Sequence, residues 1–184
     1  PKNYDRLIEI YEALAAHGYR EVGQEYLQNV LDTAKQLDAY DSGRIYYYLG
    51  EYQKAYLALD EARDKGGADS YLYLGRAYAA TGDYNYASSV CNNYLSKQGP
   101  NAEIYNELGL CEMAKKEYQN ALAAFQAGKQ IEGNSLMQTL CFNEIVAYEY
   151  LEDYQQAEVL MNAYLQNYPD DQTAIREQQF LSTR

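Results

Sequence analysis

The sequence is poor in residues that break helices and in residues that bind metals. Its 184 residues include 3 prolines, 1 histidine and no tryptophan. Because the prolines lie at the start of the chain or between predicted helices, long helices are unobstructed. The 3 cysteines form no Cys-x-x-Cys pair and fall within predicted helices, where free thiols act as small apolar side chains. We therefore expect no metal and no other cofactor.

Positive charge and long apolar runs are also scarce. Lys and Arg together number 15 against 27 Asp and Glu, which gives a formal net charge of −12. Such a charge repels phosphate backbones and anionic lipids, so nucleic acid is not an expected partner. No apolar run approaches the roughly 20 residues that cross a bilayer, and this segment is not expected to insert into a membrane.

The chain starts at Pro1 rather than at methionine. Removal of a signal or an anchor would leave a remainder of this kind. Two locations therefore stay open: the cytoplasm, or an exported or lipid-anchored protein whose N-terminal signal is missing from this chain.

Tyrosine, by contrast, is abundant, with 23 residues, and a short phrase built around it recurs four times. The phrase is a tight turn, then Tyr52, Tyr84, Tyr118 or Tyr154, and then an alanine three residues later. Successive tyrosines of the phrase are 32, 34 and 36 residues apart. A period averaging about 34 residues is typical of stacked helical hairpins, so the chain is predicted to be a solenoid.

The third unit shows the plan of a repeat. Its first helix carries apolar or small residues at helical spacing, namely Tyr71, Leu74, Gly75 and Tyr78. A Thr-Gly-Asp turn follows, and a second helix with Ala87 on its inward face ends at Gly99-Pro100. In the next unit, Gly109 and Ala121 stand where two helices must approach closely, so a larger residue there would push the hairpin apart.

Two units resemble the tetratricopeptide repeat. The matching residues are Tyr71, Leu74, Gly75, Tyr78 and Ala87 in one unit, and Tyr105, Leu108, Gly109, Ala121, Phe125 and Gly128 in the other. In the fifth unit Glu144 and Ile145 replace the usual Leu-Gly pair. The resemblance implies an all-α, right-handed superhelical solenoid of helix–turn–helix repeats with a C-terminal capping helix. We expect a single domain over 1–184, with repeats at about 4–35, 36–67, 68–101, 102–135 and 138–171, and a capping helix at about 171–181.

The resemblance also implies a binding surface, because the first helices of such repeats line a concave groove. The residues of these helices that lie outside the packing face are Tyr40, Arg44, Tyr47, Tyr48, Leu72, Arg76, Asn106, Leu110, Met113, Phe142, Val146 and Tyr150. They predict an aromatic and apolar groove that holds a peptide or protein partner. One branch of the family clamps a C-terminal carboxylate, but Tyr40 and Leu72 stand here where that branch needs basic residues.

Some of these residues have a second interpretation. Arg44 and Arg76 could grip a carboxylate of the partner, or each could pair with a neighbouring acid such as Asp41 or Asp69. Leu110, Met113 and Phe142 could contact an apolar peptide or belong to the core. Both alternatives stay open at the level of sequence.

No constellation of catalytic residues is visible in the sequence. It has no metal-ligand cluster, no Gly-rich phosphate loop after a strand and no nucleophile elbow. We therefore expect a non-enzymatic interaction scaffold. The alternatives are a self-assembling module that forms a homodimer through its N-terminal hairpin and the helix with Ile175 and Phe180, or an adaptor segment of a larger exported or anchored protein.

Overall fold

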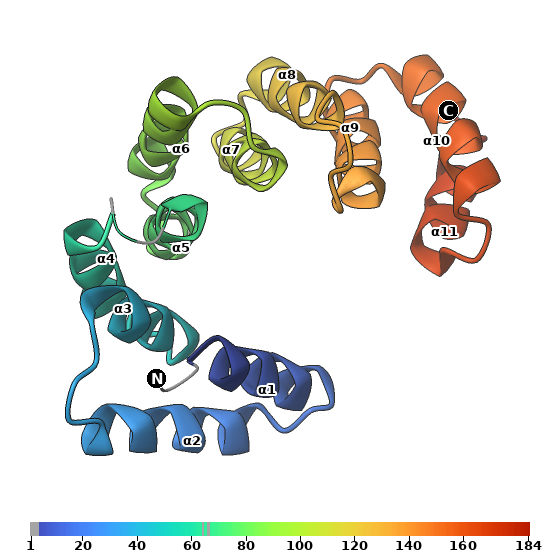
Figure 1. The fold of residues 1–184 in the computed structure, drawn as a ribbon. Coiled ribbons are helices and arrows are strands. Elements are labelled where there is room, and N and C mark those ends of the chain that lie inside the picture. The colour runs from blue at the N-terminus through green and yellow to red at the C-terminus, as the bar shows by residue number, and fades with distance from the viewer. Residues whose placement is uncertain (1–3, 64, 66) are drawn as a thin grey trace. The chain divides into compact units, whose positions relative to one another are not determined.

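The computed structural model describes residues 4–63, 65 and 67–184. These residues form eleven α-helices and no strand, which confirms the all-α class (Figure 1). The helices are α1 Tyr4–Ala16, α2 Arg20–Thr33, α3 Ala39–Tyr48, α4 Tyr52–Glu61, α5 Gly67–Ala80, α6 Tyr84–Gln98, α7 Ala102–Ala114, α8 Tyr118–Lys129, α9 Met137–Tyr150, α10 Tyr154–Asn167 and α11 Gln172–Leu181. Within the described part of the chain, no helix has the length and apolarity that a membrane crossing needs.

The helices belong to two compact units, Pro1–Asp83 and Tyr84–Arg184. In the first unit, α1 packs on α2, α3 on α4 and α4 on α5. In the second, every helix from α6 to α11 packs on the next one along the chain. This neighbour-to-neighbour packing is that of stacked helix–turn–helix repeats, as the sequence predicts. The expected organisation of 1–184 as one domain with the stated repeat bounds stays a prediction.

The recurring turn has one conformation whether or not it contains glycine. Gly50, Lys116 and Glu152 open the turn at equivalent places, with φ of 78°, 64° and 60°. Glycine adopts this left-handed region freely, whereas a residue with a Cβ pays roughly 1 kcal/mol or more there. The strain at Lys116 and Glu152 shows that packing of the hairpin fixes the turn, and that glycine only makes it easier to form.

The α7–α8 hairpin is held by a close approach of its two helices. A Cβ atom added at Gly109 would lie 2.3 Å from the Phe125 ring, and Ala121 is fully buried. Real Cβ atoms do not come so close to a neighbour, so the ring occupies the space that glycine leaves open. The close contact expected at Gly109 is therefore confirmed.

The first hairpin reaches the same packing with the residues exchanged. Helices α1 and α7 are both 13 residues long, and α2 and α8 each begin four residues after them. In this register Tyr11 occupies the place of Gly109, and Gly23 the place of Ala121. A Cβ added at Gly23 would lie 2.8 Å from the Tyr11 ring, which is buried. The ring is therefore on the first helix and the glycine on the second, which is the reverse of the α7–α8 hairpin.

The departure in the fifth repeat has a physical account. Ile145 and Met161 fill the space between α9 and α10, so this hairpin needs no glycine contact. Glu144 is buried, but it forms a salt bridge with Lys129 and accepts a hydrogen bond of 2.9 Å from Gln126. Two donors from α8 thus compensate the carboxylate that replaces the usual leucine.

The last helix begins at a strong cap. The Asp171 carboxylate accepts hydrogen bonds of 2.9 and 3.1 Å from the backbone N–H groups of Thr173 and Ala174. Its Oδ2 also accepts a bond of 2.6 Å from the Tyr164 hydroxyl. These bonds favour the ionised carboxylate and hold the pKa of Asp171 below its usual value. The C-terminal capping helix that the sequence predicts is therefore present as α11.

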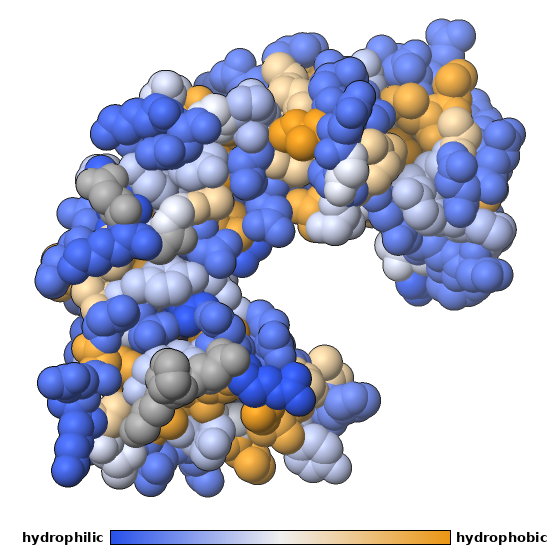
Figure 2. Space-filling view, viewed as in Figure 1, coloured by the Kyte–Doolittle hydropathy of each residue, from blue (hydrophilic) through white to orange (hydrophobic). Residues whose placement is uncertain are grey.

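The surface agrees with the acidic composition. In Figure 2, hydrophilic side chains cover most of the visible face, and apolar side chains reach the surface in separate patches. Exposed aromatic residues include Tyr19 and Tyr26 in the first unit, and Tyr86 and Tyr150 in the second. Isolated apolar residues are normal on a protein surface, so only residues that gather around a hollow support a functional argument.

Candidate partner-binding site

Helix α3 ends in three consecutive tyrosines. The directions of their side chains follow from the burial of Ile45, the residue before them. Ile45 is fully buried among Leu7, Ile8 and Tyr11 of α1. The side chains that follow Ile45 are turned by about 100° per residue, because a helix has 3.6 residues per turn. As a result Tyr48 lies against Tyr11, with ring centroids 4.9 Å apart, while Tyr47 lies between Tyr52 and Tyr73 at 5.9 and 5.6 Å.

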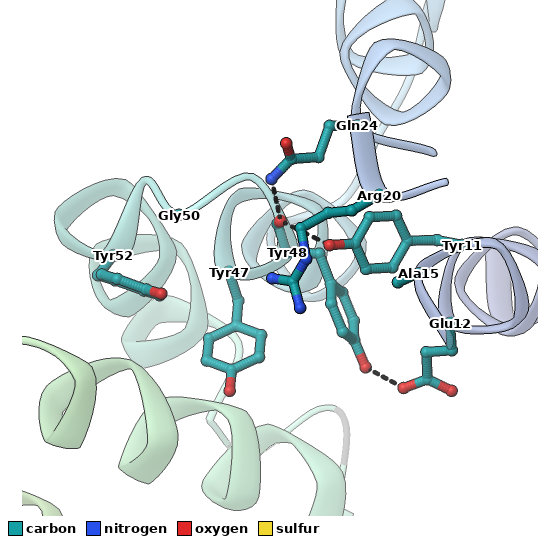
Figure 3. A pocket seen from close by; sticks show the side chains of 9 residues that line it. All are labelled: Tyr11, Glu12, Ala15, Arg20, Gln24, Tyr47, Tyr48, Gly50 and Tyr52. Atoms are coloured by element: carbon teal, nitrogen blue, oxygen red, sulfur yellow. Dashed lines mark hydrogen bonds between the residues drawn. The ribbon is translucent and has the colours of Figure 1, made fainter. Parts of the chain in front are cut away.

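The rings of Tyr11, Tyr47, Tyr48 and Tyr52 surround a pocket of about 340 Å³, which we call the tyrosine pocket (Figure 3). It is lined by Tyr11, Glu12, Ala15, Arg20, Gln24, Tyr47, Tyr48, Gly50 and Tyr52. The residues come from α1, α2, the end of α3, the following turn and the start of α4. All of them belong to the first compact unit.

Hydrogen bonds fix the floor of the tyrosine pocket. The Tyr11 hydroxyl and the Gln24 side-chain amide both donate to the backbone carbonyl of Tyr48, at 3.3 and 3.2 Å. The Tyr48 hydroxyl donates to the Glu12 carboxylate and lies 2.9 Å from the Tyr73 hydroxyl. Burial, together with these bonds, raises the pKa of Tyr48 well above its usual range. Tyr48 is therefore a neutral hydrogen-bond donor whose ring is held in place.

Arg44 is committed to contacts within the chain. Its guanidinium donates to Asp5 at 2.6 Å and to Asp41 at 2.5 Å, and it lies 4.2 Å from the centroid of the Tyr40 ring. The side chain is buried. Of the two interpretations of Arg44, pairing with Asp41 is the one present in the structure, and Asp5 of α1 adds a second carboxylate that sequence spacing did not indicate.

The other expected groove residues of the first unit differ in their surroundings. Leu72 is buried in the core, whereas Arg76 is half-buried with its guanidinium carbon 5.9 Å from the Tyr73 ring centroid. Asp69, a partner considered for Arg76, accepts a hydrogen bond of 3.3 Å from the Tyr40 hydroxyl. Tyr40, Tyr47 and Tyr48 are half-buried, so each keeps part of its ring accessible.

In the second unit the expected groove residues divide into core and surface. Asn106 is buried and accepts a hydrogen bond of 2.9 Å from Asn143, which joins α7 to α9. Met113 and Phe142 are half-buried and pack against apolar clusters. By contrast, Leu110 is 43% exposed and Tyr150 57% exposed.

Tyr150 and Val146 are the remaining expected groove residues of the second unit. The Tyr150 ring stacks on Tyr118, with centroids 5.0 Å apart. Val146, one turn earlier on α9, is half-buried. Leu110 and Tyr150 are thus the members of the expected set in this unit that offer most surface to a partner.

A second pocket, of about 330 Å³, lies between α8, α9 and α10. It is lined by Lys129, Met137, Cys141, Glu144, Leu160, Ala163, Tyr164, Asn167 and Tyr168. Its cationic and anionic groups are already paired, since Lys129 bonds to Glu144. Burial raises the pKa of the Cys141 thiol, which keeps it protonated. The charged side chains that line this pocket are therefore already engaged with each other.

Of the residues that line the tyrosine pocket, sequence reasoning placed only Tyr47 and Tyr48 in the groove. It missed the other seven, which are Tyr11, Glu12, Ala15, Arg20, Gln24, Gly50 and Tyr52. The tyrosine of the recurring phrase was a usable signal for Tyr52. Arg20 and Gln24 carried no such signal, because they lie on a second helix, whereas the expected groove is lined by first helices. They reach the pocket through the packing of α2 beside the end of α3, which the Gln24 bond to Tyr48 demonstrates.

The fold and its repeats identify the class of this protein. Residues 40–87 and 92–134 match the family model of the tetratricopeptide repeat. The chain belongs to the tetratricopeptide-repeat family, whose members are typically non-enzymatic scaffolds for protein interaction. No curated protein matches the sequence.

Solved structures agree with this assignment. A thermophilic tetratricopeptide-repeat protein of Thermus thermophilus superposes with a TM-score of 0.75 and 16% identity, over 99% of this chain and 100% of its own. A tetratricopeptide-repeat protein of Parabacteroides merdae gives a TM-score of 0.67 and 17% identity, over 97% and 72%. The second such domain of human RPAP3, solved with an HSP70 peptide, gives 0.57 and 16%, over 64% and 97%. At these identities the likeness establishes the fold.

Proposed function

We propose that this chain binds a peptide segment of a protein partner, and that the tyrosine pocket is a principal contact surface. The observation that carries the proposal is the pocket itself, with four tyrosines around a hollow of about 340 Å³. Tyrosine supplies a large, nearly rigid apolar area and a polar tip, and it is enriched where proteins recognise partners. The human RPAP3 domain, which was solved with a bound peptide, supports the idea that this fold can hold one.

Within each unit, the contact residues that we propose are fewer than those of the groove expected from the sequence. In the first unit they are Tyr40, Tyr47, Tyr48 and Arg76, together with the other residues of the tyrosine pocket. In the second unit a separate surface consists of Leu110, Val146 and Tyr150, with Met113 and Phe142 at its edge. Arg44, Leu72 and Asn106 are left out, because buried contacts within the chain already occupy them.

The proposal can be tested with peptides of defined sequence. Random 12-residue peptides displayed on phage are selected on the wild-type chain, and the best binder is synthesised and titrated by fluorescence anisotropy. We expect Tyr52→Ala to weaken its binding about tenfold, because an aromatic contact in a binding site is commonly worth more than 1 kcal/mol. Failure to select any peptide that prefers the folded chain would overturn the proposal.

A matched control separates this pocket from exposed tyrosine in general. Tyr26 lies on α2, is 50% exposed and is not among the residues that line the pocket. Tyr26→Ala removes the same ring, and we expect less than a twofold change in affinity. Equal losses for Tyr26→Ala and Tyr52→Ala would contradict the assignment of the pocket as the contact surface.

Self-association is a second candidate, which one surface feature favours. Tyr19 at the N-cap of α2 is 60% exposed, and Val22 and Tyr26, which follow it three and seven residues later on the helix, are 55% and 50% exposed. A second copy could cover them. Light scattering at increasing protein concentration tests for self-association. A dimer that Val22→Lys dissociates would support it, and a monomer at every concentration would contradict it.

A further inference from the structure

The α1–α2 turn aims a positive charge into the tyrosine pocket. Gly18 adopts a φ of 84°, and the Tyr19 N–H closes the turn by donating to the Leu14 carbonyl at 2.8 Å. Helix α2 then begins at Arg20, and Gln24 lies on the same face one turn later. Because Gln24 bonds to the end of α3, this face of α2 is turned toward the pocket. Figure 3 shows the Arg20 guanidinium reaching into it, toward Tyr47 and Tyr48.

Arg20 has no partner of its own in the described part of the chain. Arg6 pairs with Glu9, Arg44 with Asp5 and Asp41, and Arg63 with Asp60. Arg20 makes no ion pair, hydrogen bond or ring contact with any described residue, and its side chain is exposed. The net charge of the chain is −12, yet the Arg20 guanidinium stabilises no contact among the described residues and is available to a ligand in the pocket.

The single carboxylate of the pocket is also engaged. Glu12 lines the same hollow but accepts the hydroxyl of Tyr48. Arg20 supplies one positive charge, which one carboxylate balances, whereas the second negative charge of a phosphate would face Glu12 and the net charge of −12 with no further cation among the residues that line the pocket. A carboxylate is therefore favoured over a phosphate as the group that meets Arg20.

We propose that Arg20 and the tyrosine pocket bind an acidic side chain, Asp or Glu, of an extended partner peptide, with the neighbouring apolar residue of that peptide on the tyrosine rings. The inference rests on the proposed function and specifies its partner chemistry. The planar guanidinium presents paired N–H donors that match the two oxygens of a carboxylate. Partial enclosure by tyrosine rings strengthens this contact relative to open water.

A double-mutant cycle tests the proposal. The peptide selected on the wild-type chain is synthesised with blocked termini, so that no terminal carboxylate is present, and compared with a version whose acidic residue is changed to Gln. We expect this change to weaken binding about fivefold on the wild-type chain, as for a half-exposed charged hydrogen bond. On Arg20→Gln the two peptides should bind within twofold of each other.

The control variant removes an equal charge elsewhere. Lys35 is exposed, lies just beyond the end of α2 and does not line the pocket. Lys35→Gln should preserve the fivefold difference between the two peptides. A coupling that Lys35→Gln abolishes as well would reflect the general field of the protein and would overturn the local contact.

The failures of the two proposals are distinguishable. If selected peptides bind and depend on Tyr52, but lack an acidic residue or show no coupling to Arg20, this inference is overturned and the proposed function stands. If replacing the acidic residue by phosphoserine gives tighter, Arg20-dependent binding, the preference for a carboxylate is overturned. If no peptide binds the folded chain, both proposals are overturned.

Discussion

The first hairpin, α1–α2, and the hairpin α7–α8 share a register, and their first helices are both 13 residues long, but they have opposite arrangements of bulk. In α7–α8 the gap is on the first helix at Gly109, and the ring of Phe125 on the second helix fills it. In α1–α2 the ring is Tyr11 on the first helix, and the gap is Gly23 on the second. In these two hairpins one bulky residue thus packs against one missing side chain, and neither of the two is tied to a fixed helix.

This exchange has a consequence for the candidate site. Because the ring sits on α1, its hydroxyl can leave the core and donate to the carbonyl of Tyr48 at the end of α3. Phe125 in the other hairpin has no polar atom to do the same. The first hairpin therefore supplies one wall of the tyrosine pocket. Its tyrosine at the place of Gly109 makes the hydrogen bond to the Tyr48 carbonyl, which a glycine at that place could not make.

The largest expected effect in this comparison is at Gly109. In Gly109→Ala the new Cβ would lie 2.3 Å from the Phe125 ring, so overpacking of about 3 kcal/mol outweighs the gain of about 1 kcal/mol in helix propensity. We expect a net loss of about 2 kcal/mol in the free energy of unfolding, measured by urea denaturation. Phe125→Leu added to Gly109→Ala should recover part of the loss, and an unchanged midpoint for the single variant would contradict the packing argument.

Changes of pH sharpen the comparison. The two glycine–ring contacts involve only uncharged groups, whereas the contact between α9 and α11 brings two carboxyl groups together. Glu149 on α9 has a buried oxygen without a hydrogen-bond partner and lies beside Glu177 of α11. Burial and the charge of Glu177 raise the pKa of Glu149 from 4.5 to about 7. Its protonated form is the one that the fold favours.

A raised folded-state pKa means that Glu149 contributes its stability below about pH 4.5, and that this contribution is lost as pH rises through about 7. Glu149→Gln stays neutral, so we expect it to match the wild type near pH 4.5 and to exceed it by about 1 kcal/mol at pH 8, the usual cost of an unsatisfied buried group. Thermal melts from pH 4.5 to 8 measure the difference. Glu132→Gln, an exposed residue after α8, is the control, and a constant offset between Glu149→Gln and wild type would refute the explanation.

The smallest effect is expected at Gly23. In Gly23→Ala the Cβ would lie 2.8 Å from one edge of the Tyr11 ring, so the overpacking cost is close to the helix-propensity gain of about 1 kcal/mol. We expect a change in unfolding free energy below about 0.5 kcal/mol, well under the effect at Gly109. A loss equal to that of Gly109→Ala would show that the two hairpins tolerate added bulk equally and would break the comparison.

Much of the fold could be predicted from the sequence because the repeat is a local code. Each hairpin is specified by residues within about 34 positions, and the tight contact at Gly109 follows from small residues placed opposite large ones. The cap at Asp171 is equally local, since its partners are two and three residues away. The left-handed turns at Lys116 and Glu152 were not predictable from residue type, because hairpin packing imposes them.

The candidate site was predictable only in part. Tyr47, Tyr48 and Tyr150 could be placed on the accessible side of first helices by spacing alone. Arg44 could not be resolved, because its fate depended on Asp5, 39 residues away on another helix. Arg20 gave no signal, since nothing near it in the chain indicates that α2 lies beside the end of α3.

The sequence by itself thus determined the helices, their pairing into hairpins and the abundance of tyrosine, all of which depend on residues close together along the chain. Only the tertiary structure decided which charges are paired and which tyrosines enclose a hollow. The physical reason is that ion pairs and pockets form between successive hairpins, where a shift of one helix by a single turn would exchange the partner of Arg44 or remove Arg20 from the pocket.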